Sequence, residues 1–198
     1  MDMLTATAMA AGLGWASGVR LYAVLFFMGL LQYADIYVLP QNLQVLAHPT
    51  VMAVSGFLFL VEFFADKIPG LDTLWDAVHT FIRIPAGAVL AAAAVAGGDP
   101  ALGIAAGLLG GVIAAGTHFT KAGGRALINT SPEPFSNWAA SISEDTLALA
   151  GLWVAFQYPL LFLTLLALFI LFALWLLPKL WRGMKRVFGA LRQPQHPL

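Results

Sequence analysis

Long apolar stretches separated by short polar segments dominate the chain. Residues 4–31, about 43–65 and 101–119 are each long enough to cross a bilayer, because about 20 helical residues span its hydrocarbon core. Residues 86–98 form a shorter apolar stretch, which reaches spanning length only if its helix includes residues before Pro85. The pattern predicts a bundle of membrane-spanning helices.

The last apolar stretch, residues 146–177, is too long for a single crossing. Pro159 lies inside it, and a proline in a helix removes a backbone donor and produces a kink or permits a turn. We therefore divide the stretch into 146–156, which needs residues from about Ala139 onward to span, and 160–177. The total becomes six spans, with five as the alternative if the last helix is only kinked.

Composition indicates the same class of protein. Hydrophobic residues make up 60% of the 198 residues and charged residues only 10%, whereas roughly 25% is usual for a soluble domain. The absence of cysteine excludes disulfides, thiolate chemistry and Cys-ligated metals. The N-terminus has no basic segment and no convincing cleavage site, so we expect a retained first helix and no signal peptide. The predicted fold is all-α, a polytopic transmembrane helix bundle.

Every Lys and Arg except Arg20 lies between the apolar stretches or after them. The basic tail, residues 179–198, places the C-terminus in the cytoplasm by the positive-inside rule. Six crossings return the N-terminus to the same side, and the charged segments 66–84 and 120–145 then face the cytoplasm. We expect a multi-pass membrane protein with both termini in the cytoplasm, with one transmembrane domain over residues 1–178 followed by the tail.

The second and third spans, and the fourth and fifth, resemble two copies of one unit. Each unit has a full-length helix, a charged segment and a short returning helix. Pro69 and Trp75 have the same separation as Pro132 and Trp138. Paired units of this kind are common in transporters, which bind substrate at the interface between the repeats. Coincidence in a chain rich in Trp and Pro is the alternative.

Small residues mark one face on each of two spans. The first span carries Gly14 and Gly18, and the fourth carries small residues at every fourth position, namely Gly103, Gly107, Gly111 and Ala115. In lipid, small residues let backbones approach closely and therefore mark contact faces between helices. Packing within the bundle is the favoured interpretation, and a homo-oligomer through these glycine faces is the alternative.

Arg20 is a cation inside an apolar stretch, where a charge costs at least about 2.5–3.5 kcal/mol. We expect Ser17 and Gly18 to interrupt this helix, with Ser17 as the N-cap of a second half-helix that carries Arg20 and Tyr22. The predicted partner of Arg20 is a buried carboxylate, and Glu62 is the preferred candidate. A bound carboxylate or phosphate ligand is the alternative.

Glu62 and Asp66 lie four residues apart near the end of the second span, with Lys67 beside them. This spacing places both carboxylates on one face of a helix. If that face points into the bundle, the pair is suited to hold a cation or to relay protons. The alternative is that they cap the helix end in contact with headgroup water.

Residues 71–84 have helical periodicity, with an apolar face and a polar face. The polar face carries Asp72, Asp76, His79 and Arg83. The pattern predicts an amphipathic helix that lies at the membrane interface or under the bundle and ends at Pro85. A solvated polar face is the favoured interpretation, and metal binding by its two acids and its histidine is the alternative.

The fourth span ends in a basic stripe formed by His118, Lys121 and Arg125. A polar segment broken by prolines follows, with Asn129 and Glu133 as candidate polar ligands. Irregular backbone at membrane depth is tolerated only where it is buried in protein or lines water. The alternative is an ordinary structured loop.

Three motifs resemble those of a bacterial integral-membrane family, the domain-of-unknown-function family 4126. They are S-G-x-R-x-Y at residues 17–22, F-x-A-D-K-I-P at residues 63–69, and T-K-x-x-x-R with N-x-S-P-E-P at residues 120–134. The resemblance covers roughly residues 8–155 and leaves the last helix outside. It implies a multi-pass protein of the bacterial inner membrane and no mechanism.

The leading functional hypothesis is a small transporter or channel-like protein for an ion or small polar solute. Its predicted pathway residues are Arg20, Tyr22, Glu62, Asp66, Lys67, His118, Lys121, Arg125, Asn129 and Glu133. A non-catalytic membrane assembly protein is the second hypothesis. A lipid-modifying enzyme with His79 or His118 as base is the third, and no catalytic motif supports it. We expect no cofactor, no metal and no nucleic acid, with membrane lipids as surroundings.

Overall fold

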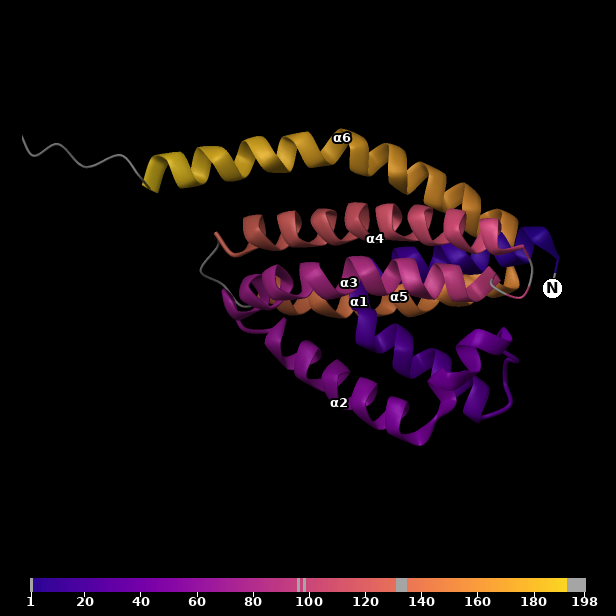
Figure 1. The fold of residues 1–198 in the computed structure, drawn as a ribbon. Helices are drawn as coiled ribbons and strands as arrows, with labels where there is room; N and C mark the ends of the chain where they lie inside the picture. Colours follow the sequence, from indigo (N-terminus) through magenta and orange to yellow (C-terminus); the bar gives the residue numbers. More distant parts are fainter. Residues whose placement is uncertain (1, 96, 98, 131–134, 192–198) are drawn as a thin grey trace, which may run out of the picture.

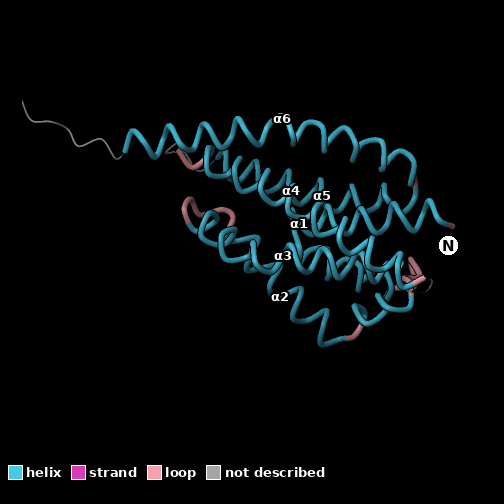
Figure 2. The backbone as a smooth tube through the Cα atoms, turned by 45° about the horizontal axis from the view of Figure 1, so that its top comes forward, coloured by secondary structure: helices cyan, strands magenta, loops and turns pink. Residues whose placement is uncertain are grey.

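The computed structural model describes residues 2–95, 97, 99–130 and 135–191, and all regular structure in them is helical (Figure 1). The predicted all-α fold is therefore confirmed. The helices are α1 (Met3–Tyr33), η1 (Gln41–Ala47), α2 (Pro49–Ala65), α3 (Leu71–Val95), α4 (Pro100–Ile128), α5 (Phe135–Gln157) and α6 (Pro159–Leu191). Figure 2 shows that the described loops gather at the two ends of the bundle, so the helices run along its length.

Polar residues and prolines set the helix starts. The Asp2 carboxylate accepts a hydrogen bond from the Thr5 amide at 3.0 Å, and the Asp99 carboxylate accepts one from the Ala101 amide at 2.8 Å. These bonds satisfy backbone donors that a helix N-terminus leaves without partners. α2, α4 and α6 each begin at a proline, whose fixed φ suits the first helical position.

The predicted division of the last apolar stretch is confirmed, since α5 ends at Gln157 and α6 begins at Pro159. The predicted end of a helix at Pro85 is wrong. α3 continues through this proline for 25 residues in total, because the charged segment and the apolar segment belong to one helix. The returning helices α3 and α5 are consequently not short, at 25 and 23 residues.

Four helices are long and apolar enough to cross a membrane, which supports the membrane class. They are α1, α3, α4 and residues Pro159–Gly183 of α6, and the bent pair of η1 and α2 would make a fifth. α5 is not among them. Length and composition thus give four or five candidate spans among the described residues.

α1 is broken at Arg20, whose φ of −146° and ψ of 73° are not helical. The chain reverses there (Figure 1), so that Asp2 at the start of α1 lines the same pocket as Val38 and Val95. The first half of α1 runs beside α4 and the second half runs back beside α2, with Phe26 against Gly56. α1 is therefore a hairpin of two half-helices that enters and leaves at one end of the bundle.

This hairpin corrects the prediction for the helical break. The helical break exists, but it lies at Arg20 and not at Ser17, whose hydroxyl donates to the Leu13 carbonyl within the helix and caps nothing. α1 is long and apolar enough to be a candidate span, but its two halves do not form one continuous straight helix. The start of α1 and the end of α6 lie at opposite ends of the bundle (Figure 1).

Close packing of glycines fixes the first half of α1. A Cβ added at Gly14 would lie 2.8 Å from the Gly110 carbonyl oxygen, and one at Gly18 would lie 2.8 Å from Thr117 Cβ. The prediction that Gly14 and Gly18 form an internal contact face is confirmed. On α4 the partner of Gly14 is Gly110, which lies outside the predicted face. Gly107 and Gly111 of the predicted face pack against Ala88 of α3, whereas a Cβ added at Gly103 would meet no described atom within 4 Å.

α6 also continues across a proline, Pro178, and extends to Leu191. Leu180 is buried, and a Cβ added at Gly123 would lie 3.0 Å from its Cδ1 atom. The beginning of the predicted tail is thus part of a helix that packs against α4.

Candidate functional site

Nine charged side chains from five helices meet next to the break in α1. We call them the charge cluster: Arg20, Glu62, Asp66, Asp76, Arg83, Lys121, Arg125, Glu144 and Asp145. Their side chains are at most 17% exposed, and those of Arg20, Glu62, Asp66 and Arg83 are 0% exposed.

Arg20 lies at the centre of the charge cluster. Its Nη1 donates a hydrogen bond to Asp66 and lies 3.6 Å from Glu62, while its Nη2 donates to the Ser141 hydroxyl at 2.9 Å. Its Nε lies 2.7 Å from Asp145 as an ion pair. Pairing with a buried carboxylate occurs as expected, but the hydrogen-bonded partner is Asp66 and not Glu62.

Glu62 is instead the partner of Arg83. The Arg83 guanidinium donates to Glu62 at 2.5 Å and to Asp76 at 2.8 Å, which links α2 and α3. It also donates to His118 Nδ1 at 3.3 Å. Because an arginine only donates, His118 accepts at Nδ1 and carries its proton on Nε2, which donates to Thr80 at 2.7 Å.

Lys121 satisfies the backbone at the helix break. Its ammonium donates to the Val19 carbonyl and to Asp66, both at 3.2 Å. Asp76 at 3.4 Å, Glu144 at 3.6 Å and Glu62 at 3.8 Å are its further ionic partners. A break at membrane depth needs such a donor, because lipid supplies none.

Arg125 joins α4 to α5. Its Nε and Nη2 donate to the two carboxylate oxygens of Glu144 at 2.8 and 2.9 Å, a two-point pairing that fits the planar guanidinium. Its Nη1 donates to the backbone carbonyls of Asp66 at 3.1 Å and Asn137 at 3.0 Å. The side chain thereby fixes the end of α2 relative to α5.

Hydrogen bonds between two asparagine side chains and Asp72 lie beside the charge cluster. Asn129 donates to the Asp72 carboxylate at 2.7 and 2.8 Å and accepts from Asn137 at 2.7 Å. Asp72 also accepts from the backbone amide of Gly70, whose φ of 85° permits the tight turn between α2 and α3. Asn129 is thus a structural bridge beside the charge cluster.

Tyr22 contacts the other histidine. His79 Nδ1 lies 2.8 Å from the Trp75 carbonyl, which can only accept, so Nε2 is the acceptor for the Tyr22 hydroxyl at 3.1 Å. The His79 ring stacks on Trp75 with 4.0 Å between ring centroids. Both imidazoles therefore use their lone pair within the protein.

The predicted amphipathic helix has the opposite orientation. The polar residues of α3 are buried, with Arg83 at 0% exposure, while Phe81 on its apolar face is 83% exposed. The favoured solvated face is therefore wrong, because the apolar side of this helix covers the outside of the bundle. The metal alternative also finds no support, since the described residues contain no group of three or more acids or histidines that could hold a metal.

Six of the ten predicted pathway residues meet at the charge cluster: Arg20, Glu62, Asp66, His118, Lys121 and Arg125. Tyr22 and Asn129 contact the neighbouring His79 and Asp72, and two predicted residues are exceptions. Lys67 donates to the Phe63 carbonyl at 3.0 Å and lies over the Phe63 ring, outside the ion pairs of the charge cluster. Glu133 lies outside the described residues. The sequence interpretation missed the contribution of α5, although Ser141, Glu144 and Asp145 share one helix face, a signal that the spacing offered.

The charge cluster holds one acid more than it holds cations, with four Lys and Arg side chains against five Asp and Glu. Four buried carboxylate oxygens accept no hydrogen bond from the described residues: Glu62 Oε2, Asp66 Oδ1, Asp76 Oδ2 and Asp145 Oδ1, of which the last is in an ion pair with Arg20. The cluster therefore has the capacity for an additional positive charge or proton.

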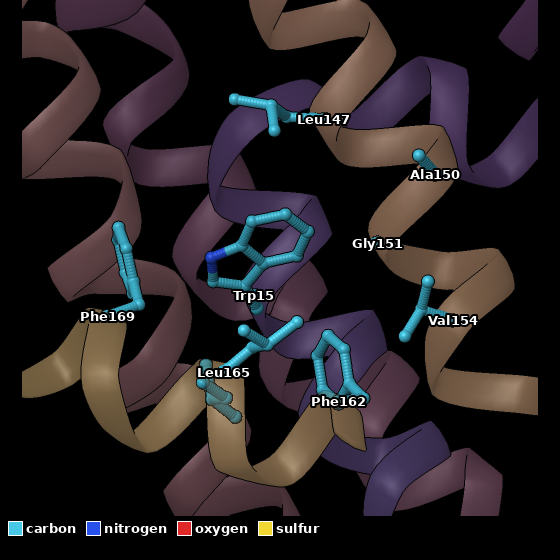
Figure 3. Close-up of a pocket in the computed structure, with 9 residues that line it drawn as sticks. Trp15, Leu147, Ala150, Gly151, Val154, Phe162, Leu165 and Phe169 are labelled. Carbon is cyan, nitrogen blue, oxygen red and sulfur yellow. The ribbon is translucent and has the colours of Figure 1, made fainter. Parts of the chain in front are cut away.

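Three pockets lie along α6. One of about 590 Å³ reaches Asp76 and His118, and one of about 370 Å³ reaches Lys121 and Glu144. The third, of about 330 Å³, is apolar and is shown in Figure 3, where Trp15 of α1 projects between α5 and α6. Trp15 lines both the second and the third pocket and so stands between the apolar region and the charge cluster.

These features define the class of the protein: an all-helical membrane protein with buried charged side chains clustered around a break in its first helix. The chain belongs to the family described as Domain of unknown function (DUF4126), which it matches over residues 7–179. The match includes most of α6, beyond the segment expected from the motifs. Neither the comparison with curated proteins nor that with solved structures gave a match.

The three motif segments that carried the family resemblance converge at the charge cluster. The first supplies Arg20, the second Asp66, and the third Lys121 and Arg125. Segments that are far apart in the chain thus build one site.

Proposed function

We propose that the protein moves a small, positively charged ion or solute across a bacterial inner membrane, with the charge cluster as its binding site. One observation carries the proposal: nine charged side chains surround a broken helix inside a bundle whose outside is apolar. Phe64 and Phe81, on the helices that supply Glu62 and Arg83, are 62% and 83% exposed. Charges enclosed in this way are expensive and typically mark pathways for ions, protons or substrates.

The broken helix supports the same proposal. In many transporters, interrupted helices supply backbone groups to a site deep in the membrane. Here Arg20 and the Val19 carbonyl lie at the interruption, and Lys121 reaches both this carbonyl and Asp66. The excess of acids favours a cation over an anion. Movement of Lys121 or Arg20 to another carboxylate would release one acid for the transported ion.

The proposed topology has five crossings, α2 to α6, and a re-entrant α1. The end of the bundle that holds Lys67 and Lys179 faces the cytoplasm by the positive-inside rule. The N-terminus then faces the opposite side, together with the segment that follows α1. The pairs α2–α3 and α4–α5 each enter the charged end and return, which keeps the two-unit interpretation as part of the proposal.

Flux into proteoliposomes tests this function. We expect uptake of at least one monovalent cation or of protons, and loss of it in Glu62→Gln and in Lys121→Met, because each removes a charge from the cluster. Asp99→Asn and Lys179→Met are matched controls, since they remove the same charges at exposed positions and should leave flux unchanged.

The alternative of a non-catalytic assembly protein makes a different prediction. It expects no flux for any ion by well-folded protein, and unaltered association with a partner in Glu62→Gln. A homo-oligomer through Gly103 of α4, which faces outward, belongs to this alternative. Folded protein that is silent across a panel of ions and pH gradients would therefore replace the transport proposal.

A further inference from the structure

The largest of the three pockets along α6 has an apolar body and a polar end. It lies between α3, α4 and α6, and Phe119, Ala122, Leu177 and Leu180 form much of its wall. Its volume of about 590 Å³ is within the range of small-molecule sites, roughly 300–1,000 Å³. Trp181, which is 58% exposed, stands at its rim.

Four polar side chains line the pocket, and three of them have their hydrogen bonds filled within the protein. Thr80 donates to the Asp76 carbonyl at 3.0 Å and accepts from His118, whose other nitrogen accepts from Arg83. Thr73 donates to Asp72 at 3.3 Å and accepts from Asn129 at 2.9 Å. None of the three needs a ligand.

Asp76 is the exception. It is 1% exposed, and its Oδ1 accepts from Arg83 at 2.8 Å and lies 3.4 Å from the Lys121 ammonium, but its Oδ2 is buried and accepts no hydrogen bond from the described residues. A buried carboxylate oxygen without a donor is costly. The occupant that suits this end of the pocket therefore brings an N–H or O–H donor, and the surplus acid of the charge cluster favours one that is positively charged.

We infer that this pocket binds an organic ammonium compound with an apolar body, whose N–H group donates to Asp76 Oδ2. The inference rests on the proposed function in taking this ligand as the transported solute, and names its chemical class. A zwitterionic phospholipid fits less well, because no Lys or Arg is among the described residues that line the pocket, and its phosphate would lack a counter-charge.

Calorimetric titration of purified protein in detergent tests the site, with decylamine as the probe. Decanoate has the same chain with a negative head, and decyltrimethylammonium has the charge without an N–H donor. We expect decylamine to bind and decanoate not to bind. Decyltrimethylammonium should bind at least about tenfold more weakly than decylamine, since it cannot form the charge-assisted hydrogen bond.

Two variants locate the binding. Asp76→Asn should weaken decylamine binding at least about tenfold, because the charge is lost. Ala122→Leu keeps every charge and fills the pocket, so it should also abolish binding, whereas Ala150→Leu fills the apolar pocket of Figure 3 and should not. Equal affinity of decylamine for wild type and Ala122→Leu, no binding to folded wild type, or a tightly held phospholipid that decylamine cannot displace would overturn the inference.

Binding and transport can fail separately. Decylamine binding that Ala122→Leu abolishes, combined with no flux of any tested solute, supports the site and rejects the transport proposal. Flux of inorganic cations without amine binding keeps the transport proposal and rejects this site.

Discussion

The two ends of the bundle are held together in different ways. At the end that contains the chain start, Leu13 of α1 and Leu152 of α5 are fully buried in an apolar core. At the other end, the same helices meet through Arg20, Glu144 and their ionic partners. The comparison teaches that the first half of α1 packs through apolar side chains near its start and through ion pairs near Arg20. Only the ion pairs carry the free-energy cost of placing charges inside a membrane.

The largest expected effect is at the charged end. Arg20→Ala should lower the free energy of unfolding by about 3–5 kcal/mol, because it leaves Asp66 and Asp145 without their main partner. Combining it with Asp66→Ala should cost much less than the sum of the two single changes. Denaturant unfolding in mild detergent measures both. Strictly additive losses would separate the two residues and contradict the network.

At the apolar end, Leu152→Ala should lower the free energy of unfolding by about 2–5 kcal/mol through the cavity it creates. Flux by the folded fraction should remain, because no charge is altered. Comparison of flux per folded molecule in Leu152→Ala and Arg20→Ala sharpens the contrast between the ends. Complete loss of flux in folded Leu152→Ala protein would show that the apolar end also belongs to the pathway.

Truncation after Arg182 should leave flux nearly unchanged. It should lower the free energy of unfolding by no more than about 0.5 kcal/mol. The truncated protein keeps Leu180, the buried residue with which α6 packs against Gly123. Unfolding and flux measurements on the shortened chain check this. Loss of flux in well-folded truncated protein would assign a role in transport to the basic tail.

Cysteine labelling tests the two ends without a stability change. The chain has no cysteine, so single substitutions give a clean signal. Ala34→Cys, which is exposed beside the end of α1, should react with an impermeant reagent from outside intact cells, and Thr130→Cys, exposed after α4, should not. The reverse pattern would invert the proposed orientation, and labelling of neither would reject the outside location of the α1 hairpin ends.

The linear pattern of the sequence was enough to predict the helices. Apolar stretches, starting prolines and the break before Pro159 gave the helical class and most helix positions, because these depend on neighbouring residues. The cost of a charge in lipid likewise identified Arg20 as a residue with a buried carboxylate partner. The motifs at Arg20, Asp66 and Lys121 indicated the family from the sequence alone, without the knowledge that these residues are in contact.

Other features depend on contacts between distant segments, and only the tertiary structure decided them. α1 has the length and apolar character of a span, yet it reverses at Arg20 because Lys121 and Asp66 satisfy the broken backbone and its charge. The polar face of α3 would suit water equally well, and it turns inward because Glu62 and Arg83 pair across two helices. Hydrophobicity along the chain measures how each segment interacts with water or lipid. The side chains that pair with a buried charge, and so take the place of water around it, come from distant parts of the sequence.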